Sequence, residues 1–315
     1  MKSKASAPGK VILFGEHFVV YGVKAILCAI NKRITVTAEQ INEEEIRIKT
    51  TIGDLTLKPN KPISEIDSAL KPLYYLADKT LKTQSQTKGI KITVESDIPL
   101  GVGLGSSSAC CVAGAAAISR LFTKNSKEEI LRLAIDAEKT IFQNTSGADC
   151  TVSTYGGIME YDKREGFAKI KSEPNFHLVI ANSNMQHSTE SIVAGVNRFK
   201  EENKEEFRKL CNKESELIEE ALELLKENNL KEIGQKINQN QEYLETIGIS
   251  NDKLRKMILI GQNEAFGAKI TGAGGGGCIF VLTDESNLND TMNQFKERNY
   301  DCFSVKIDFE GLNTF

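Results

Sequence analysis

The segment Pro99-Leu-Gly-Val-Gly-Leu-Gly-Ser-Ser-Ser-Ala109 places three glycines at alternate positions, then three hydroxyls, and then an alanine-rich run over 109–117. Alternate glycines let the backbone turn tightly and approach a ligand without a Cβ in the way. Serine is favoured at helix N-caps and alanine inside helices, so we expect a helix to follow the glycines with a serine as its cap. The unpaired N–H groups and positive dipole end of such a helix would favour a bound phosphate.

The surroundings of this segment distinguish it from two well-known nucleotide-binding loops. A strand-like segment over 91–94 precedes it, so the order is strand, glycine-rich turn and helix. The chain contains no Gly-x-x-x-x-Gly-Lys-Ser/Thr sequence, and Ser106 and Ser108 stand where the dinucleotide fingerprint needs its third glycine. The alternative is an ordinary glycine–serine loop that caps a buried helix.

The composition is typical of a soluble globular protein that is longer than one hydrophobic core sustains. The 315 residues are 40% hydrophobic and 26% charged, and this length favours two domains. A net charge of −3 argues against a nucleic-acid partner, and no apolar run approaches the ~20 residues of a membrane span. Seven cysteines at irregular spacings indicate free thiols. Together with the lack of a signal-peptide pattern, they predict a cytoplasmic protein.

Hydrophobic periodicity predicts a strand-rich first part and a helix-rich second part. In the first part we expect strands over 11–14, 25–30, 34–38, 45–49, 54–57, 90–94, 152–161 and 176–181, and helices over 64–82 and 127–143. In the second part we expect helices over 192–200, 205–227, 230–244, 252–265 and 289–298, and strands over 278–282 and 303–307. Ser126 and Glu129 form a predicted capping box, and Gly267 is the expected C′ residue of the helix before it. The chain is therefore expected to be α+β, with domains over 1–178 and 179–315 and a cleft between them.

Lys269-Ile-Thr-Gly-Ala-Gly-Gly-Gly-Gly-Cys278 is a second glycine-rich segment. Gly272, Gly274 and Gly277 satisfy Gly-x-Gly-x-x-Gly literally, but a strand follows and not a helix, so the context of a dinucleotide site is missing. A glycine run between two strands fits close approach to a ligand. The alternative is tight packing against another backbone.

Polar residues elsewhere supply the groups that phosphoryl transfer needs. Lys10, Glu16 and His17 lie among strand residues and glycines near the N-terminus, and Glu138 precedes Asp149 across a glycine turn. Phosphoryl transfer needs hard oxygen ligands for Mg²⁺, a cation near the transferred group and a carboxylate for the acceptor hydroxyl. The alternatives are a solvated edge lysine, a core histidine and surface salt bridges of the two acids.

Taken together, these segments resemble the signature sequences of the GHMP small-molecule kinases. The three segments are Pro8–His17, Pro99–Ser108 and Lys269–Cys278, and their order and spacing cover nearly the whole chain. Within that family the sequence is most similar to the branch that phosphorylates mevalonate. The features that carry this similarity are Gly15-Glu-His-x-Val-Val-Tyr-Gly22, Glu138-Lys-x-Ile141, Asn144-x-Ser-Gly-x-Asp149, Ser153-Thr-Tyr-Gly-Gly157, and Ser188-Thr189 before Val193-Ala-Gly-Val196.

The resemblance implies a two-domain GHMP kinase fold, with an N-terminal domain like the second domain of ribosomal protein S5 and a ferredoxin-like C-terminal domain. It implies ATP as cosubstrate, Mg²⁺ as cofactor, mevalonate as the small-molecule substrate and 5-phosphomevalonate as the product. A homodimer is also expected, as in many relatives, and neither a nucleic acid nor a membrane is expected as a partner.

The same resemblance implies a role for each candidate site residue. Asp149 is the expected base for the primary hydroxyl of the acceptor, and Lys10 is the expected cation beside it. Ser107 and Glu138 are expected to bind Mg²⁺. The acceptor site is expected to include Glu16, His17, Thr189, Gly274 and Gly275. The ATP phosphates are expected to lie against Pro99, Leu100, Gly101, Val102, Gly103, Leu104, Gly105, Ser106, Ser107 and Ser108.

One departure from the family pattern and three alternative functions stay open. Many relatives carry a basic residue shortly before the threonine of the Ser188-Thr189 pair, where this chain has Met185-Gln186-His187. The contacts to the substrate carboxylate are therefore not assigned. The alternative functions are another GHMP kinase acting on phosphomevalonate, homoserine or a sugar, a nucleotide-binding sensor without catalysis, and a dinucleotide oxidoreductase.

Overall fold

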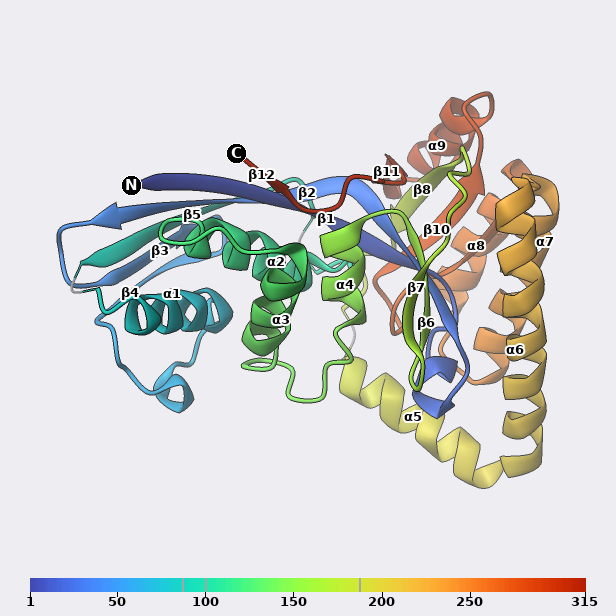
Figure 1. The fold of residues 1–315 in the computed structure, drawn as a ribbon. Helices are drawn as coiled ribbons and strands as arrows, with labels where there is room; N and C mark the ends of the chain where they lie inside the picture. The colour runs from blue at the N-terminus through green and yellow to red at the C-terminus, as the bar shows by residue number, and fades with distance from the viewer. Residues whose placement is uncertain (87, 100, 187) are drawn as a thin grey trace.

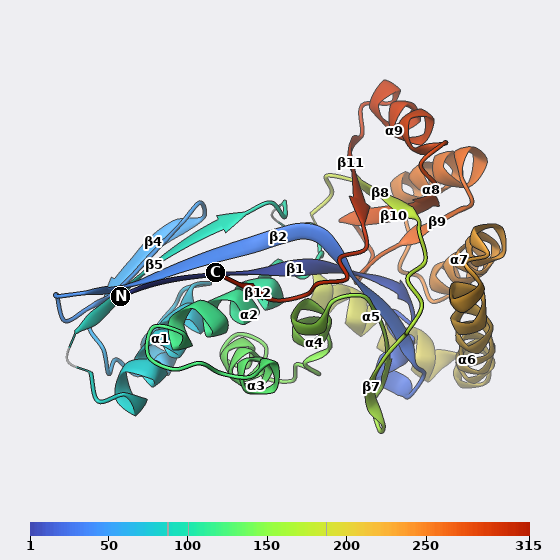
Figure 2. The same ribbon diagram turned by 45° about the horizontal axis from the view of Figure 1, so that its top comes forward.

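The structure is a computed structural model, and it describes residues 1–86, 88–99, 101–186 and 188–315. Its elements form two β-sheets, each with helices packed against it (Figure 1; Figure 2). Across the described parts of the chain, none of the helices is long and apolar enough to cross a lipid bilayer.

The larger sheet is built on two long antiparallel strands that lie side by side. β1 (Lys2–Phe14) pairs with β2 (Ala25–Ile41), and β2 pairs in turn with β5 (Gly89–Ser96). The main order is β12-β1-β2-β5-β3-β4, while β6 pairs with the start of β2 and with β7. The remaining strands are β3 (Ile46–Thr50), β4 (Gly53–Leu57), β6 (Ile158–Asp162), β7 (Gly166–Lys169) and β12 (Asn313–Thr314).

Four helices cover one face of this sheet (Figure 1). They are α1 (Lys71–Thr83), α2 (Ser106–Ser119), α3 (Lys127–Glu138) and α4 (Ala148–Tyr155). α2 is apolar on nearly all sides, as expected of a central buried helix, and it packs on β1 and β2 with the other three helices around it. Because the glycine-rich loop leads directly into α2, this buried helix fixes where the loop lies.

The smaller sheet has the order β11-β8-β10-β9 and is antiparallel throughout. α7 and α8 pack on β9, α9 packs on β8 and β11, and α6 packs on α7 (Figure 2). The strands are β8 (His177–Asn182), β9 (Gly267–Ile270), β10 (Cys278–Thr283) and β11 (Asp301–Lys306). The helices are α5 (Thr189–Glu202), α6 (Lys204–Glu227), α7 (Leu230–Thr246), α8 (Asp252–Glu264) and α9 (Leu288–Glu297).

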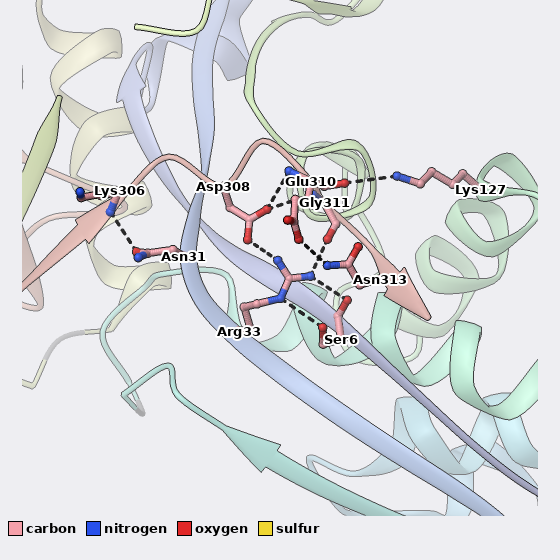
Figure 3. A network of polar contacts seen from close by, with 9 residues as sticks. All are labelled: Ser6, Asn31, Arg33, Lys127, Lys306, Asp308, Glu310, Gly311 and Asn313. Carbon is pink, nitrogen blue, oxygen red and sulfur yellow. Dashed lines mark hydrogen bonds and ion pairs between the residues drawn. The ribbon is translucent and has the colours of Figure 1, made fainter. Parts of the chain in front are cut away.

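The C-terminal segment returns from the smaller sheet to the larger one and is bound there by polar contacts (Figure 3). Arg33 of β2 forms an ion pair with Asp308 and donates to the Gly311 carbonyl at 2.5 Å. The Leu312 N–H donates to the Thr154 carbonyl at 3.0 Å. The segment therefore lies against the C-terminal end of α4.

Most predicted elements are confirmed, including the capping box of α3, in which Ser126 and Glu129 bond each other reciprocally. The two strands predicted over 25–30 and 34–38 are one continuous strand, β2, and the helix predicted to reach residue 143 ends at Glu138. The division of the chain into 1–178 and 179–315 stays a prediction, and β12 lies in the larger sheet.

Three expectations about element boundaries are wrong for identifiable reasons. The first half of the strand predicted over 152–161 is helix α4, because packing of Val152 against β2 outweighs the β-propensity of its Val and Thr residues. The helix predicted from residue 64 begins at Lys71, since Pro72 suits only the first turn. Gly267 is not a C′ residue but begins β9. An added Cβ there would lie 2.3 Å from the Gly234 carbonyl oxygen of α7.

Candidate active site

Lys10 and Asp149 form an ion pair where β1 passes the start of α4. The Lys10 Nζ lies 3.1 Å from the Asp149 Oδ2. The lysine side chain is 7% exposed and the aspartate side chain 33%, so the carboxylate can be reached by a ligand while the ammonium is buried. α4 starts directly after Gly147, whose φ of 76° is left-handed, and an added Cβ there would lie 2.7 Å from Ile135. This glycine turn places Asp149 in the first turn of the helix.

The glycine-rich loop is bonded to the same lysine. Gly101, Gly103 and Gly105 have left-handed φ angles of 71°, 74° and 72°. The Lys10 N–H donates to the Leu104 carbonyl at 2.9 Å. An added Cβ on Gly105 would lie 2.7 Å from the Lys10 Cγ, so only glycine lets the loop approach the lysine this closely.

α2 begins directly after this loop, and its N-cap is Gly105 rather than a serine. The expectation of a serine cap is wrong, because Ser106, Ser107 and Ser108 form the first helical turn. The N–H groups of a first turn have no partner within the helix, so they and the dipole end remain available to an anion. Val102 and Leu104 are buried and anchor the loop. Pro99 precedes the loop, and Leu100 lies outside the described residues.

Glu138 is a buried carboxylate that has no basic partner among the described residues. Its two oxygens accept hydrogen bonds from the hydroxyls of Ser108 and Thr145. Ser107, the predicted partner of Glu138 at a metal, is half-buried and lines a neighbouring cavity instead. Consecutive side chains on a helix point about 100° apart, and for this reason the two serines face different neighbours.

The donor set around Glu138 consists of a carboxylate and hydroxyls, which are hard oxygen ligands of the kind that Mg²⁺ prefers. No group of three or more His, Cys, Asp and Glu side chains gathers for a metal in the parts of the chain that the structure describes. A magnesium ion there would therefore complete its shell with water and phosphate oxygens, as is usual for this ion.

Two cavities open beside these groups. The larger has a volume of about 300 Å³ and reaches Ser106 and Ser107 of the loop. Most of its other walls are apolar, among them Ile34, Leu70, Leu73, Val94, Ile141 and Phe142. The smaller has a volume of about 120 Å³ and contains Asp149. It is lined further by Ile12, Gly15, Val19, Ala25, Leu27, Ser146, Ala148 and Tyr161.

Two of the predicted acceptor residues lie in the turn that follows β1. Glu16 is buried and forms an ion pair with Lys269. His17 has a left-handed φ of 60°, and its Nε2–H donates to the Ala273 carbonyl at 2.8 Å. Burial lowers the pKa of His17. Both residues thus contact the second glycine-rich segment, and neither is among the residues that line the two cavities.

The other three predicted acceptor residues also lie outside the linings of these cavities. The Gly275 N–H donates to the Ile249 carbonyl at 2.7 Å, and an added Cβ on Gly274 would lie 2.6 Å from the same oxygen. Thr189 is exposed at the first turn of α5, where Ser188 is the N-cap. His187 of the Met185-Gln186-His187 departure lies outside the described residues.

Sequence reasoning missed Ser146, Lys269 and Glu214 as residues of the site region. Ser146 lines the smaller cavity, and Lys269 and Glu214 are fully buried near the turn after β1. Glu214 falls four residues after Leu210 and three before Leu217, so it lies on the apolar face of the helix predicted over 205–227. A glutamate on the apolar face of a predicted helix indicates a buried carboxylate, and this was the signal in the sequence that could have identified Glu214.

Comparison with known proteins identifies the family of this chain. Residues 69–157 match the GHMP kinases N terminal domain, and residues 221–301 match the GHMP kinases C terminal family. The mevalonate kinase of Thermococcus sibiricus is 36% identical, with 99% of this chain and 98% of that protein covered. The mevalonate kinase of Pyrococcus furiosus is also 36% identical, with 90% and 89% covered.

The fold agrees as well. The crystal structure of the Methanococcus jannaschii mevalonate kinase superposes with a TM-score of 0.87 at 29% identity, covering 97% of this chain and 98% of that one. The predicted two-domain fold class is thereby confirmed. The chain belongs to the GHMP kinase family, and within it to the mevalonate kinases.

Proposed function

We propose that the chain transfers the γ-phosphoryl group of ATP to the primary hydroxyl of mevalonate, giving 5-phosphomevalonate and ADP. The relatives that align with this chain over nearly their full length are named mevalonate kinase. The observation that carries the proposal is the Lys10–Asp149 pair, which joins the glycine-rich loop to the smaller cavity through one buried lysine.

Asp149 acts as the base in this proposal. Its carboxylate is exposed to the smaller cavity, so an acceptor hydroxyl there can give it a proton. The hydroxyl oxygen then forms a bond to the γ-phosphorus, in line with the bond between that phosphorus and the bridging oxygen. The latter bond breaks, and the bridging oxygen leaves as part of ADP. Lys10 lies beside Asp149 and stabilises the negative charge on the transferred group.

The loop and the larger cavity hold the nucleotide. The N–H groups of the glycine-rich loop and of the first turn of α2 bind the phosphates. The cavity of about 300 Å³ has apolar walls and begins at Ser106 and Ser107, so it suits a planar base attached to those phosphates. Ser107 and Glu138 would hold Mg²⁺ once the Ser107 side chain turns from the larger cavity toward Glu138, and Ser108, which already contacts Glu138, would be a further hydroxyl ligand. The ion, when bound, would neutralise charge on the β- and γ-phosphates.

The smaller cavity favours mevalonate over the acceptors of other GHMP kinases. Ile12, Val19 and Leu27 give it apolar walls that fit an acceptor with a methyl group. Its lining contains no Lys or Arg among the described residues, and a phosphorylated acceptor, whose phosphate adds about two negative charges to the carboxylate that mevalonate also carries, would need such partners more. The homodimer and the cytoplasmic location stay predictions from the sequence.

The test is a coupled assay of ADP release with Mg-ATP and four acceptors in parallel: mevalonate, phosphomevalonate, homoserine and galactose. The proposal predicts turnover on mevalonate alone. Turnover on one of the other acceptors would contradict the assignment of mevalonate, while tight ATP binding without turnover on any acceptor would contradict the assignment of a kinase.

A further inference from the structure

A second cluster of charged side chains lies where the turn after β1 meets α6, α7 and β9. Glu214 of α6 is 0% exposed. Its Oε1 accepts the Gly15 N–H at 3.0 Å, and its Oε2 accepts the Asn240 Nδ2–H of α7 at 2.5 Å. Beside it, Glu16 is ion-paired with Lys269 of β9. Two buried carboxylates thus lie near one buried lysine, which pairs with Glu16 and acts on Glu214 through its charge.

Burying these charged groups costs free energy of folding. A buried charge needs a partner and hydrogen bonds on all its atoms, yet the Glu16 Oε2 and the Asn240 Oδ1 lack a hydrogen-bond partner among the described residues. An apolar side chain at position 214 would pack on the same helix face at lower cost. Such a side chain would supply no acceptor for the Asn240 amide within the helices, and none for the Gly15 N–H at the acceptor cavity.

Gly15 connects this cluster to the acceptor cavity. It lines the cavity that contains Asp149, and its φ of 96° with the φ of 60° at His17 makes a sharp left-handed turn. An added Cβ on Gly15 would lie 2.5 Å from the Lys24 carbonyl oxygen. Three contacts from the C-terminal half hold this turn: the Gly15 N–H donates to Glu214, the Lys269 ammonium donates to Glu16, and the His17 ring donates to the Ala273 carbonyl.

We propose that Glu214 is a positioning residue for the phosphoryl acceptor, because its ionised carboxylate holds the Gly15 N–H and thereby fixes one wall of the acceptor cavity. The inference rests on the proposed function, since it concerns the same cavity. It adds that a residue of α6, which does not touch this cavity, sets the affinity for the acceptor.

The charge state of Glu214 gives this role a pH dependence. Burial raises the pKa of Glu214 to about 7, Lys269 opposes the rise, and Glu16 adds to it. A protonated carboxyl is a weaker acceptor than a carboxylate, so the turn is held less firmly at lower pH. The titratable groups that face Glu214 are Lys269 of β9, Glu16 of the turn, Cys211 of α6 and Tyr243 of α7. Burial lowers the pKa of the nearby His17 from its usual value.

The experiment measures KM for mevalonate and kcat at saturating Mg-ATP between pH 6 and 8.5, for the wild type and for Glu214→Gln. The glutamine keeps the size of the side chain and an oxygen for the Gly15 N–H. Its new NH₂ group can donate to the Asn240 Oδ1 after the Asn240 side-chain amide flips by about 180°. The matched control is Glu220→Gln, which removes an exposed carboxylate of the same helix that pairs with Lys236.

We expect the wild-type KM to rise about fivefold as the pH falls through 7, the difference between a charge-assisted and a neutral hydrogen bond. Glu214→Gln should have the raised KM at every pH with an unchanged kcat, and Glu220→Gln should behave as the wild type. A wild-type KM that does not change with pH would overturn the proposal, and this measurement does not depend on the folding of any variant. A KM of Glu214→Gln equal to that of the wild type at pH 8 would overturn it as well. If another acceptor is the one turned over, the proposed function fails and the same profiles with that acceptor still test Glu214.

Discussion

Lys10 and Lys269 are both buried and each lies beside a carboxylate, but the two carboxylates differ in exposure. The Lys10 partner, Asp149, is one-third exposed and faces a cavity. The Lys269 partner, Glu16, is 1% exposed, and a second carboxylate, Glu214, adds to the cluster. Burial lowers the pKa of Lys269, and the neighbouring carboxylates oppose that change.

In our proposal, access to a ligand and not residue type separates the catalytic pair from the supporting cluster. A carboxylate that a hydroxyl can reach is able to accept its proton, whereas a carboxylate enclosed with a lysine can only hold backbone and side chains in place. We call Lys10 and Asp149 the open pair, and changes there should lower turnover with little effect on stability. We call Glu16, Glu214 and Lys269 the enclosed cluster, and changes there should lower stability or substrate affinity.

The largest effect on stability is expected for Lys269→Met. The change leaves Glu16 and Glu214 buried without their cation, and breaking a buried pair in this way costs about 3–5 kcal/mol. Chemical denaturation of the variant and the wild type measures this loss of unfolding free energy. Lys24→Met is the matched control, because Lys24 pairs with two carboxylates at the surface and should cost about 1 kcal/mol or less. Equal losses in the two variants would contradict the distinction.

The pH dependence of stability should show the enclosed cluster directly. The pKa of Glu214 is about 7 in the folded state and near 4.5 when unfolded. Below both values the group is protonated in each state, and above 7 the folded state must bury a charge, so stability is lost as the pH rises through this window. The unfolding free energy of the wild type relative to Glu214→Gln should fall by up to roughly 3 kcal/mol between pH 4.5 and 8. A constant difference between the two proteins would show that Glu214 does not titrate there.

Lys10→Met tests the open pair. Removing the cation beside the transferred phosphoryl group should lower kcat by about 10²-fold. Because Asp149 is partly exposed, the unfolding free energy should fall by about 1 kcal/mol or less. Steady-state kinetics and denaturation on one preparation give both numbers. A stability loss as large as that of Lys269→Met, with turnover retained, would reverse the assignment of the two lysines.

A loss of stability without a loss of turnover is expected for the contacts of the C-terminal segment. Asp308→Asn keeps the shape of the side chain but weakens the ion pair with Arg33, and the loss of a charge-assisted bond costs about 2 kcal/mol. Turnover should be unchanged, since this cluster touches only the end of α4 that is remote from Asp149. A lower kcat in this variant would mean that the segment also orients α4.

The local part of this site could be predicted from the sequence, and the long-range part could not. Alternate glycines before Ser106 and the turn at Gly147 are local signals, and the structure has a loop and a helix start at these places. The contact of Glu138 with Ser108 rather than Ser107 depends on helix rotation, which one residue changes by about 100°. The pairing of Glu16 with Lys269 joins distant parts of the chain, and no spacing in the sequence indicates it.

The most direct test of the open pair is the turnover of Asp149→Asn with mevalonate and Mg-ATP, measured beside the wild type together with the affinity of each protein for ATP. Asparagine has nearly the same shape as aspartate but cannot take up the proton of the acceptor hydroxyl. We predict a kcat lower by at least ~10²-fold, with the affinity for ATP unchanged. Wild-type turnover in this variant would remove Asp149 from the reaction and contradict the account.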